Sequence, residues 1–122
     1  MKNKFWLLDP EEHDFPAAAD YLELLYKETA VKEIVERLKN NPTIKKKAKD
    51  ILRAGQLPLL PKDNMHVKDD LKKVKQGKKL SPILLVRDNG KLIIADGYHR
   101  VCTIYYLSED LEVPCRITGV QE

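Results

Sequence analysis

The chain has 122 residues, of which 43% are hydrophobic and 34% charged, and it contains five glycines and seven prolines. This length predicts one domain, and the composition excludes a disordered or low-complexity protein. No window approaches the roughly 20 apolar residues of a membrane span, and the first residues lack the apolar core of a secretion signal, so we expect a cytoplasmic protein that does not enter a membrane.

The net charge of +3 is unevenly distributed along the chain. Residues 37–79 contain 14 basic and four acidic residues, a net charge of +10. A basic segment of this kind can neutralise the phosphates of a nucleic acid or attract an anionic metabolite. The alternative, which we favour, is the solvated face of amphipathic helices.

The first half of the chain has the periodicity of three helices. Asp14 and Pro16 predict the start of a helix over residues 14–27, with Asp14 as its N-cap. Thr29 is expected to cap a second helix that stops at Asn40-Asn41-Pro42. A third helix is expected from Thr43 to Ala54, with Gly55 as its C-terminal cap.

The character of the sequence changes from Leu57. Pro58 and Pro61 bracket a short apolar segment that is incompatible with a regular helix and is predicted to be an extended connection. A polar loop over residues 63–66 follows, and then a helix over residues 67–76 that Gly77 ends.

Two apolar runs, residues 82–86 and 91–95, flank Asp88-Asn89-Gly90, which is a strong hairpin signal. The runs are continuous rather than alternating, so helices should cover both faces of the sheet. A helix over residues 98–107 and a strand over residues 112–118 complete the pattern. We therefore expect an α/β fold, in which a helical part (residues 1–56) packs on a small mixed sheet built from residues 82–95 and 112–118, with residues 57–60 as a candidate additional strand.

Four other residues are expected to belong to the hydrophobic core or to anchor a segment to it. Cys102 and Cys115 fall in a predicted helix and a predicted strand, where a free cysteine usually behaves as a small buried hydrophobe. Trp6, with Phe5, is expected to anchor the N-terminal segment to the domain rather than to stack on bases.

The turn from Asp96 to Arg100 follows a buried strand and opens a helix. The first backbone N–H groups of a helix favour an anion, and Gly97 lets the backbone approach a ligand closely. Arg100 can offer a bidentate fork to phosphate or carboxylate. His99 can act as an acid or base near neutral pH, and Asp96 can contact a metal or a hydroxyl group. The plainer alternative is that Asp96 only caps the helix and that His99 and Arg100 are exposed helix residues.

The span from Leu57 to Ile117 resembles the ParB/sulfiredoxin superfamily, on the hairpin over residues 83–95 and the turn Gly97-Tyr98-His99-Arg100. The resemblance implies that nucleotide phosphates bind at the turn, with ATP or another nucleotide and possible Mg²⁺ as cofactors. It implies Asp96 and His99 as catalytic residues. The implied ligand-binding residues are Gly97, Tyr98, His99, Arg100, Asn64 and His66.

Differences from the family pattern exclude two of the activities found in the family. Tyr98 stands where sulfiredoxins carry their reactive cysteine and where ParB proteins carry a glutamate, so neither activity is expected. The turn is most similar to that of the free-serine kinases of the superfamily, matched at Asp96, Gly97, His99 and Arg100. Upstream, Asn64 and His66 occupy the place of the family's polar loop, without its arginine.

Three functions remain open from the sequence. The first is a phosphotransferase or NTPase that acts on a small molecule, with a nucleotide or a phosphorylated metabolite as its ligand. The second is a non-catalytic regulator in which the turn senses a nucleotide and the N-terminal helices engage a partner. The third, less favoured, is a nucleic-acid-binding or nuclease-like protein, motivated by the basic central segment.

Overall fold

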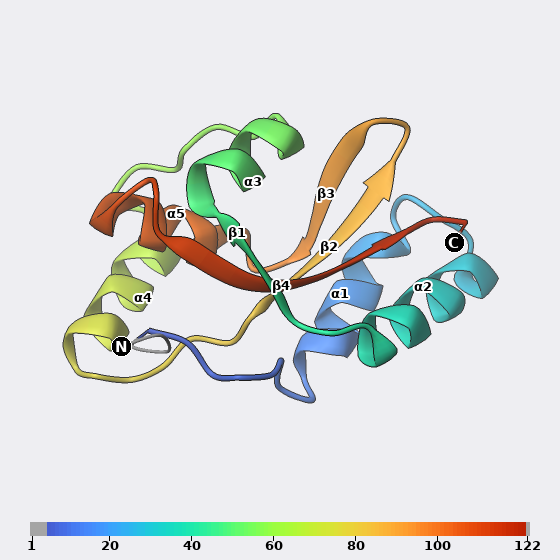
Figure 1. The fold of residues 1–122 in the computed structure, drawn as a ribbon, viewed down its shortest axis with the longest axis horizontal. Helices are drawn as coiled ribbons and strands as arrows, with labels where there is room; N and C mark the ends of the chain where they lie inside the picture. Colours follow the sequence, from blue (N-terminus) through green and yellow to red (C-terminus); the bar gives the residue numbers. More distant parts are fainter. Residues whose placement is uncertain (1–4, 122) are drawn as a thin grey trace.

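The computed structural model describes residues 5–121, which form a mixed α/β arrangement with helices on both faces of a sheet (Figure 1). The elements in chain order are α1 (Asp14–Leu22), α2 (Glu28–Asn40), β1 (Ile44–Lys47), α3 (Ala48–Gly55), α4 (Met65–Lys75), β2 (Ile83–Asp88), β3 (Lys91–Asp96), α5 (Tyr98–Leu107) and β4 (Glu112–Gly119).

The sheet has the strand order β1-β4-β2-β3. Strands β2 and β3 form the predicted antiparallel hairpin, and Asn89 and Gly90 both have the positive φ that its two-residue turn requires. Strand β4 runs parallel to β2 and antiparallel to β1. The sheet is therefore mixed, as expected.

Both faces of the sheet are covered, which confirms the interpretation of the continuous apolar runs. Ile83 and Leu85 of β2 lie in one hydrophobic cluster with residues of α3, α4 and α5, which we call the α5-side core. Leu84 and Val86 lie in a second cluster with residues of α1 and α2, the α1-side core. All four side chains are fully buried, and each contributes about 1.5–3 kcal/mol by leaving water.

The helix predicted from Thr43 to Ala54 is wrong in its first half. Residues 44–47 instead form β1, and helix α3 begins only at Ala48. Strand β1 pairs with β4 in a register that places Lys47 opposite Glu112. Strand pairing with a segment more than 60 residues away outweighs the local helical pattern. The suggestion that residues 57–60 join the sheet is also wrong, because this segment has no regular structure and the fourth strand is β1.

Several predicted helix ends are also wrong. Helix α1 ends at Leu22 rather than at residue 27, and the N-cap of α2 is Lys27 rather than Thr29. Gly55 is the last residue of α3, and the left-handed position falls on Gln56. Asp14 is not an N-cap. It is buried, and its carboxylate accepts hydrogen bonds from the Glu11 backbone N–H and the Ser81 hydroxyl.

The expected core residues are confirmed. Trp6 is 3% exposed, belongs to the α5-side core and forms an isolated bridge with Leu80, so it anchors the N-terminal segment. Cys102 and Cys115 are free and fully buried. Burial raises the pKa of both thiols, that of Cys115 to about 12, so neither is poised as a nucleophile.

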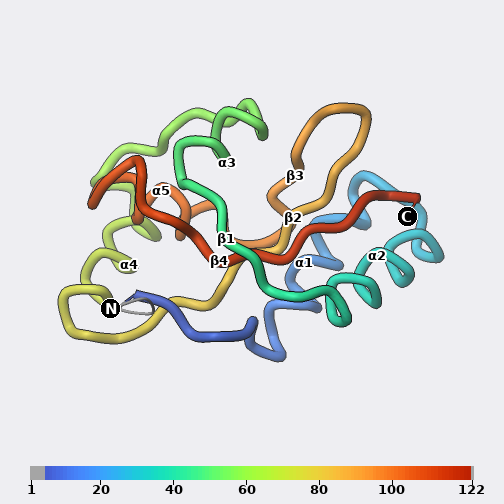
Figure 2. Tube along the Cα trace, viewed as in Figure 1, coloured from blue at the N-terminus to red at the C-terminus, as the bar shows by residue number. Residues whose placement is uncertain are grey.

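The extended connection after α3 is fixed by α5. Figure 2 follows this connection as it passes from α3 to α4 beside α5. The Tyr106 hydroxyl donates to the Leu60 carbonyl oxygen at 2.6 Å, and the Tyr98 hydroxyl donates to the Pro58 carbonyl oxygen at 2.5 Å. Within residues 5–121, no helix combines the length and the apolar character that crossing a membrane requires.

Candidate functional site

The Gly97 turn is shaped by close packing. Gly97 has φ 111° and is the N-cap of α5. A Cβ atom at this position would stand 2.3 Å from the Ile83 Cγ2 atom, so only glycine fits. The first hydrogen bond of the helix runs from the Val101 N–H to the Gly97 carbonyl oxygen. The N–H groups of residues 98–100 precede that bond and have no partner within the helix, which is the arrangement that stabilises an anion.

Arg100 lies in this site, but its guanidinium group already has protein partners. Its Nη2 atom donates to the Asp96 Oδ2 atom at 2.5 Å, and its Nη1 atom donates to the Ser81 carbonyl oxygen at 2.6 Å. The Asp14 carboxylate is 3.9 Å from Nη1. Only 14% of the Arg100 side chain is exposed. A phosphate that used this fork would have to compete with Asp96.

The Asp96 carboxylate is not the cap of α5, because Gly97 occupies that position and no side chain caps the helix. Desolvation raises the pKa of the Asp96 carboxyl. Arg100 opposes this shift, and the neighbouring Asp14 carboxyl adds to it. Raising the pKa brings a carboxyl closer to the range in which it can exchange a proton near neutral pH. Asp96 thus has the environment of an acid or base, held in place by Arg100.

Two histidines from different helices meet beside the turn. The rings of His66 (α4) and His99 (α5) have their centroids 4.6 Å apart and are tilted by 49°. The pKa of His99 is lowered, first by burial and then by His66, so its neutral form predominates near pH 7. Asn64 has a structural role here: its side-chain oxygen accepts from the backbone N–H groups of His66 and Val67 and so caps α4.

The turn opens into a polar pocket, a cavity of about 320 Å³. Helix α4 supplies His66, Asp70 and Lys73, and the turn supplies Asp96, His99 and Arg100. The other lining residues are Glu11, His13, Asp14, Ala17, Lys79, Leu80, Ser81 and Gly97. Charges of both signs are present. The structure thus brings His66 to the predicted turn residues, while Asn64 acts one step away, as the cap of the helix that carries His66.

Asp70 is a site residue that was not predicted from the sequence. Its side chain is 13% exposed and lines the polar pocket, with the Lys73 ammonium group 3.9 Å away. Burial raises the pKa of the Asp70 carboxyl, and Lys73 lowers it in part. The only sequence signal was spacing, since His66, Asp70 and Lys73 recur at i, i+4 and i+7 and therefore share one face of α4.

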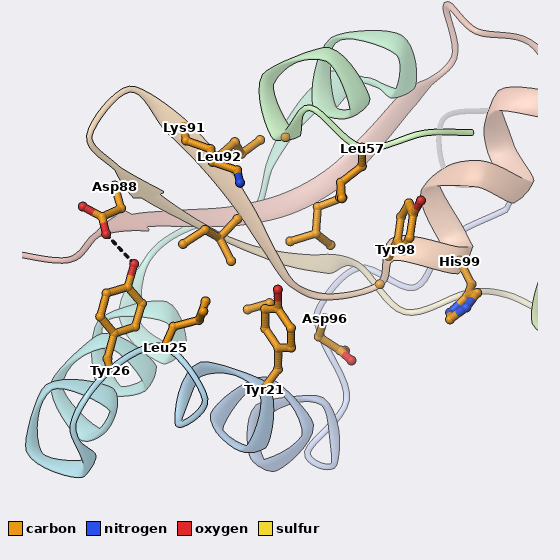
Figure 3. A pocket seen from close by; sticks show the side chains of 15 residues that line it. Tyr21, Leu25, Tyr26, Leu57, Asp88, Lys91, Leu92, Asp96, Tyr98 and His99 are labelled. Atoms are coloured by element: carbon orange, nitrogen blue, oxygen red, sulfur yellow. Dashed lines mark hydrogen bonds between the residues drawn. The ribbon is translucent and has the colours of Figure 1, made fainter. Parts of the chain in front are cut away.

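A second cavity of about 690 Å³ lies on the other side of the turn, and we call it the hairpin groove (Figure 3). Its walls include Tyr21, Leu25, Tyr26, Leu57 and Tyr98. Asp88 accepts a hydrogen bond of 2.6 Å from the Tyr26 hydroxyl at the hairpin end. The groove and the polar pocket share Asp96, Gly97 and His99, so the turn separates an apolar cavity from a charged one.

No set of three or more His, Cys, Asp or Glu side chains among the described residues is arranged to hold a metal ion. Mg²⁺ commonly binds proteins through one or two carboxylates together with substrate phosphates. The polar pocket contains three aspartates, Asp14, Asp70 and Asp96, of which Asp96 is already paired with Arg100 and Asp14 with Ser81.

Searches against protein-family models, curated proteins and solved structures found no match to this chain.

Proposed function

We propose that this chain is a ParB/sulfiredoxin-like protein that binds a nucleotide or another phosphate ligand in the polar pocket, at the Asp96–Arg100 turn. The observation that carries the proposal is the start of α5, where the N–H groups of residues 98–100 precede the first helical hydrogen bond and where His99 and Arg100 line the polar pocket. Lys73 and Lys79 line the same cavity and add positive charge.

The reaction that this environment supports best is phosphoryl transfer to a small molecule. The nucleophilic oxygen of the acceptor loses its proton to Asp96 or to neutral His99, and it forms a bond to the γ-phosphorus as the bond to the β-phosphate oxygen breaks. The amide groups of the turn and the lysines stabilise the charge on the transferred group. Mg²⁺, when bound with the nucleotide through pocket carboxylates, would supply further charge neutralisation.

A regulator that binds without turnover is the second candidate, and the pairing of Arg100 with Asp96 favours it. The guanidinium group of Arg100 already donates hydrogen bonds to the Ser81 carbonyl oxygen and the Asp96 carboxylate. Release of inorganic phosphate or of a diphosphate nucleotide, measured with each nucleotide that binds, separates the two candidates.

Nucleic-acid binding draws support from Lys45, Lys46 and Lys47, which are all exposed on β1. It predicts an affinity that falls steeply with salt. A flat titration with single-stranded and duplex oligonucleotides at low salt would remove it.

The proposal is tested by thermal shift with ATP, ADP, CTP and GTP, with and without Mg²⁺. A ligand that binds only the folded state raises the melting temperature by mass action. Arg100→Ala also removes structural hydrogen bonds, so the decisive variant is Lys73→Ala, with Lys72→Ala as its matched control on the same helix. Only Lys73 of this pair lines the polar pocket. We expect a shift that Lys73→Ala reduces and Lys72→Ala preserves. No shift with any nucleotide, or equal loss in both variants, would contradict the proposal.

A further inference from the structure

The hairpin groove follows β3, the strand at one edge of the sheet. Strand β3 is last in the strand order and pairs only with β2 among the described strands. Every residue from Lys91 to His99 lines the groove, so the cavity runs along the length of the strand (Figure 3). At the rise of a β-strand, the regular part of β3, residues 91–94, spans about 10 Å, enough to pair with about four residues of an extended chain, and a β-bulge follows before Asp96.

The backbone of this edge offers hydrogen-bonding groups to the groove. Asp88 and Lys91 close the two-residue hairpin turn as a hydrogen-bonded pair. The alternation of an antiparallel ladder then directs the N–H and C=O groups of Leu92 and Ile94 away from β2. The Leu92 carbonyl oxygen lies 3.3 Å from the point that a Cβ atom of Gly55 would occupy, so the end of α3 borders the edge there. Within the described part of the chain, no backbone hydrogen bond from another element meets these groups. Such a row recognises another extended backbone.

The two walls of the groove suit the alternating side chains of an added strand. Tyr21 and Leu25 stand on the α1 side, with Tyr26 beyond them, whereas Leu57 and Tyr98 stand on the opposite side (Figure 3). Tyr21 is 44% exposed and Leu25 is 49% exposed. Side chains of an added strand would point alternately to one wall and the other, so each wall would gain apolar cover.

The charges of the groove select the kind of segment that fits. Asp88 lies opposite Lys91 in the strand register, and Asp96 is paired with Arg100, so each carboxylate at the two ends of the groove has a basic neighbour. Between these ends the strand carries only Leu92, Ile93, Ile94 and Ala95. The complement of such a surface is an uncharged segment.

The other edge of the sheet is built differently. All four residues of β1 are exposed, and three of them are Lys45, Lys46 and Lys47. Lysines along an edge discourage the addition of another strand. The β1 edge of the sheet thus carries lysines, whereas the β3 edge is apolar and lies between the two sides of the hairpin groove.

We propose that the edge of β3 binds an extended, centrally uncharged peptide segment of a partner protein, which adds as a fifth strand. This interaction rests on the sheet edge alone and holds whether or not phosphate binds at the turn. Because the groove ends at Asp96 and His99, the bound segment would end beside the polar pocket.

The test uses the full chain and a random heptapeptide library displayed on phage, followed by synthesis of the enriched peptides. We expect enriched sequences without charge at their central positions. Leu25→Asp, which places a carboxylate in the groove wall, should weaken binding about tenfold or more. Leu24→Asp is the matched control, because Leu24 is 80% exposed and does not line the groove. N-methylation of alternate peptide bonds should abolish binding in one register and spare it in the other.

Three outcomes would overturn the proposal. The first is a library that yields no binder. The second is binding that Leu25→Asp and Leu24→Asp affect equally. The third is a dimer of the chain alone, found by sedimentation and lost in Leu25→Asp, which would show that a second copy occupies the edge. Nucleotide thermal shifts measured on Leu25→Asp keep this test separate from that of the phosphate site.

Discussion

Gly97 satisfies two constraints at once. Its φ of 111° lies in the region that L side chains rarely adopt, and the side chain of Ile83 fills the space where a Cβ atom would stand. The position therefore couples β2 to the start of α5, because only glycine lets the turn pack this closely against Ile83.

Gly97→Ala should destabilise the fold by about 3–5 kcal/mol, since it adds both backbone strain and a steric clash in the core. Gly77→Ala is the control for the strain alone, because Gly77 has φ 78° but no other atom lies within 4 Å of the point that its Cβ would occupy. We expect it to cost about 1 kcal/mol. Urea unfolding of both variants measures the difference, and equal costs would show that the contact with Ile83 relaxes easily.

Asp70 should make stability depend on pH in an unusual direction. Burial raises the pKa of its carboxyl, so the folded protein holds this proton to a higher pH than the unfolded chain does. The stabilisation that protonation provides is complete below the unfolded pKa and is lost as pH rises through the raised folded pKa. At neutral pH the ionised carboxylate therefore opposes folding.

Asp70→Asn should raise the urea midpoint at pH 7, and the gain should shrink as the pH falls through the raised pKa of the wild-type carboxyl, which then becomes protonated. Asp69→Asn is the control, because Asp69 is exposed on the same helix. A lower midpoint for Asp70→Asn at pH 7 would mean that Lys73 and the nearby histidines outweigh the burial of the carboxylate.

At the scale of elements, the sequence was most informative where local signals and packing agree. The hairpin, the helix after Gly97 and the strand containing Cys115 were predicted close to their observed bounds, because turn chemistry and apolar runs point to the same structure. Strand β1 is not predictable from the local sequence because Lys45-Lys46-Lys47 is polar, exposed and held by pairing with β4. Pairing between distant segments leaves no local signature.

The same reason limited prediction of the candidate site. The turn residues were found because they are adjacent in sequence, whereas Asp14 and Asp70 reach the polar pocket from α1 and α4. The pairing of Arg100 with Asp96 and Ser81 was equally invisible, since it depends on how β2, β3 and α5 meet.

Helix α2 is fastened to the end of β4 by Arg37. Its Nε atom donates to the Thr118 hydroxyl at 3.1 Å, and its Nη2 atom donates to the carbonyl oxygens of Gly119 and Val120 at 2.7 and 3.0 Å. Arg37→Lys keeps the charge but loses the planar fork, so we expect a loss of about 1–3 kcal/mol by chemical denaturation. Arg53→Lys, at an 80% exposed side chain on α3, should change stability by less than about 0.5 kcal/mol. Equal effects would show that the Arg37 hydrogen bonds are replaced by water without cost.

At the scale of the whole molecule, one sheet separates two hydrophobic clusters, and β2 contributes to both. Leu84 faces the α1-side core and Leu85 faces the α5-side core, and both side chains are fully buried. Because adjacent residues of one strand belong to different cores, we expect the two cores to unfold together, as one domain.

Leu84→Ala and Leu85→Ala should each destabilise the protein by about 2–5 kcal/mol. In both variants the unfolding curve followed by Trp6 fluorescence, which reports on the α5-side core, should coincide with the curve followed by far-UV circular dichroism, to which α1 and α2 contribute. If Leu84→Ala instead shifted the circular dichroism transition alone and left the Trp6 transition in place, the α1-side core would be a separate cooperative unit. The polar pocket, which takes Asp14 from α1 and Asp70 from α4, would then depend on the docking of two units rather than on one fold.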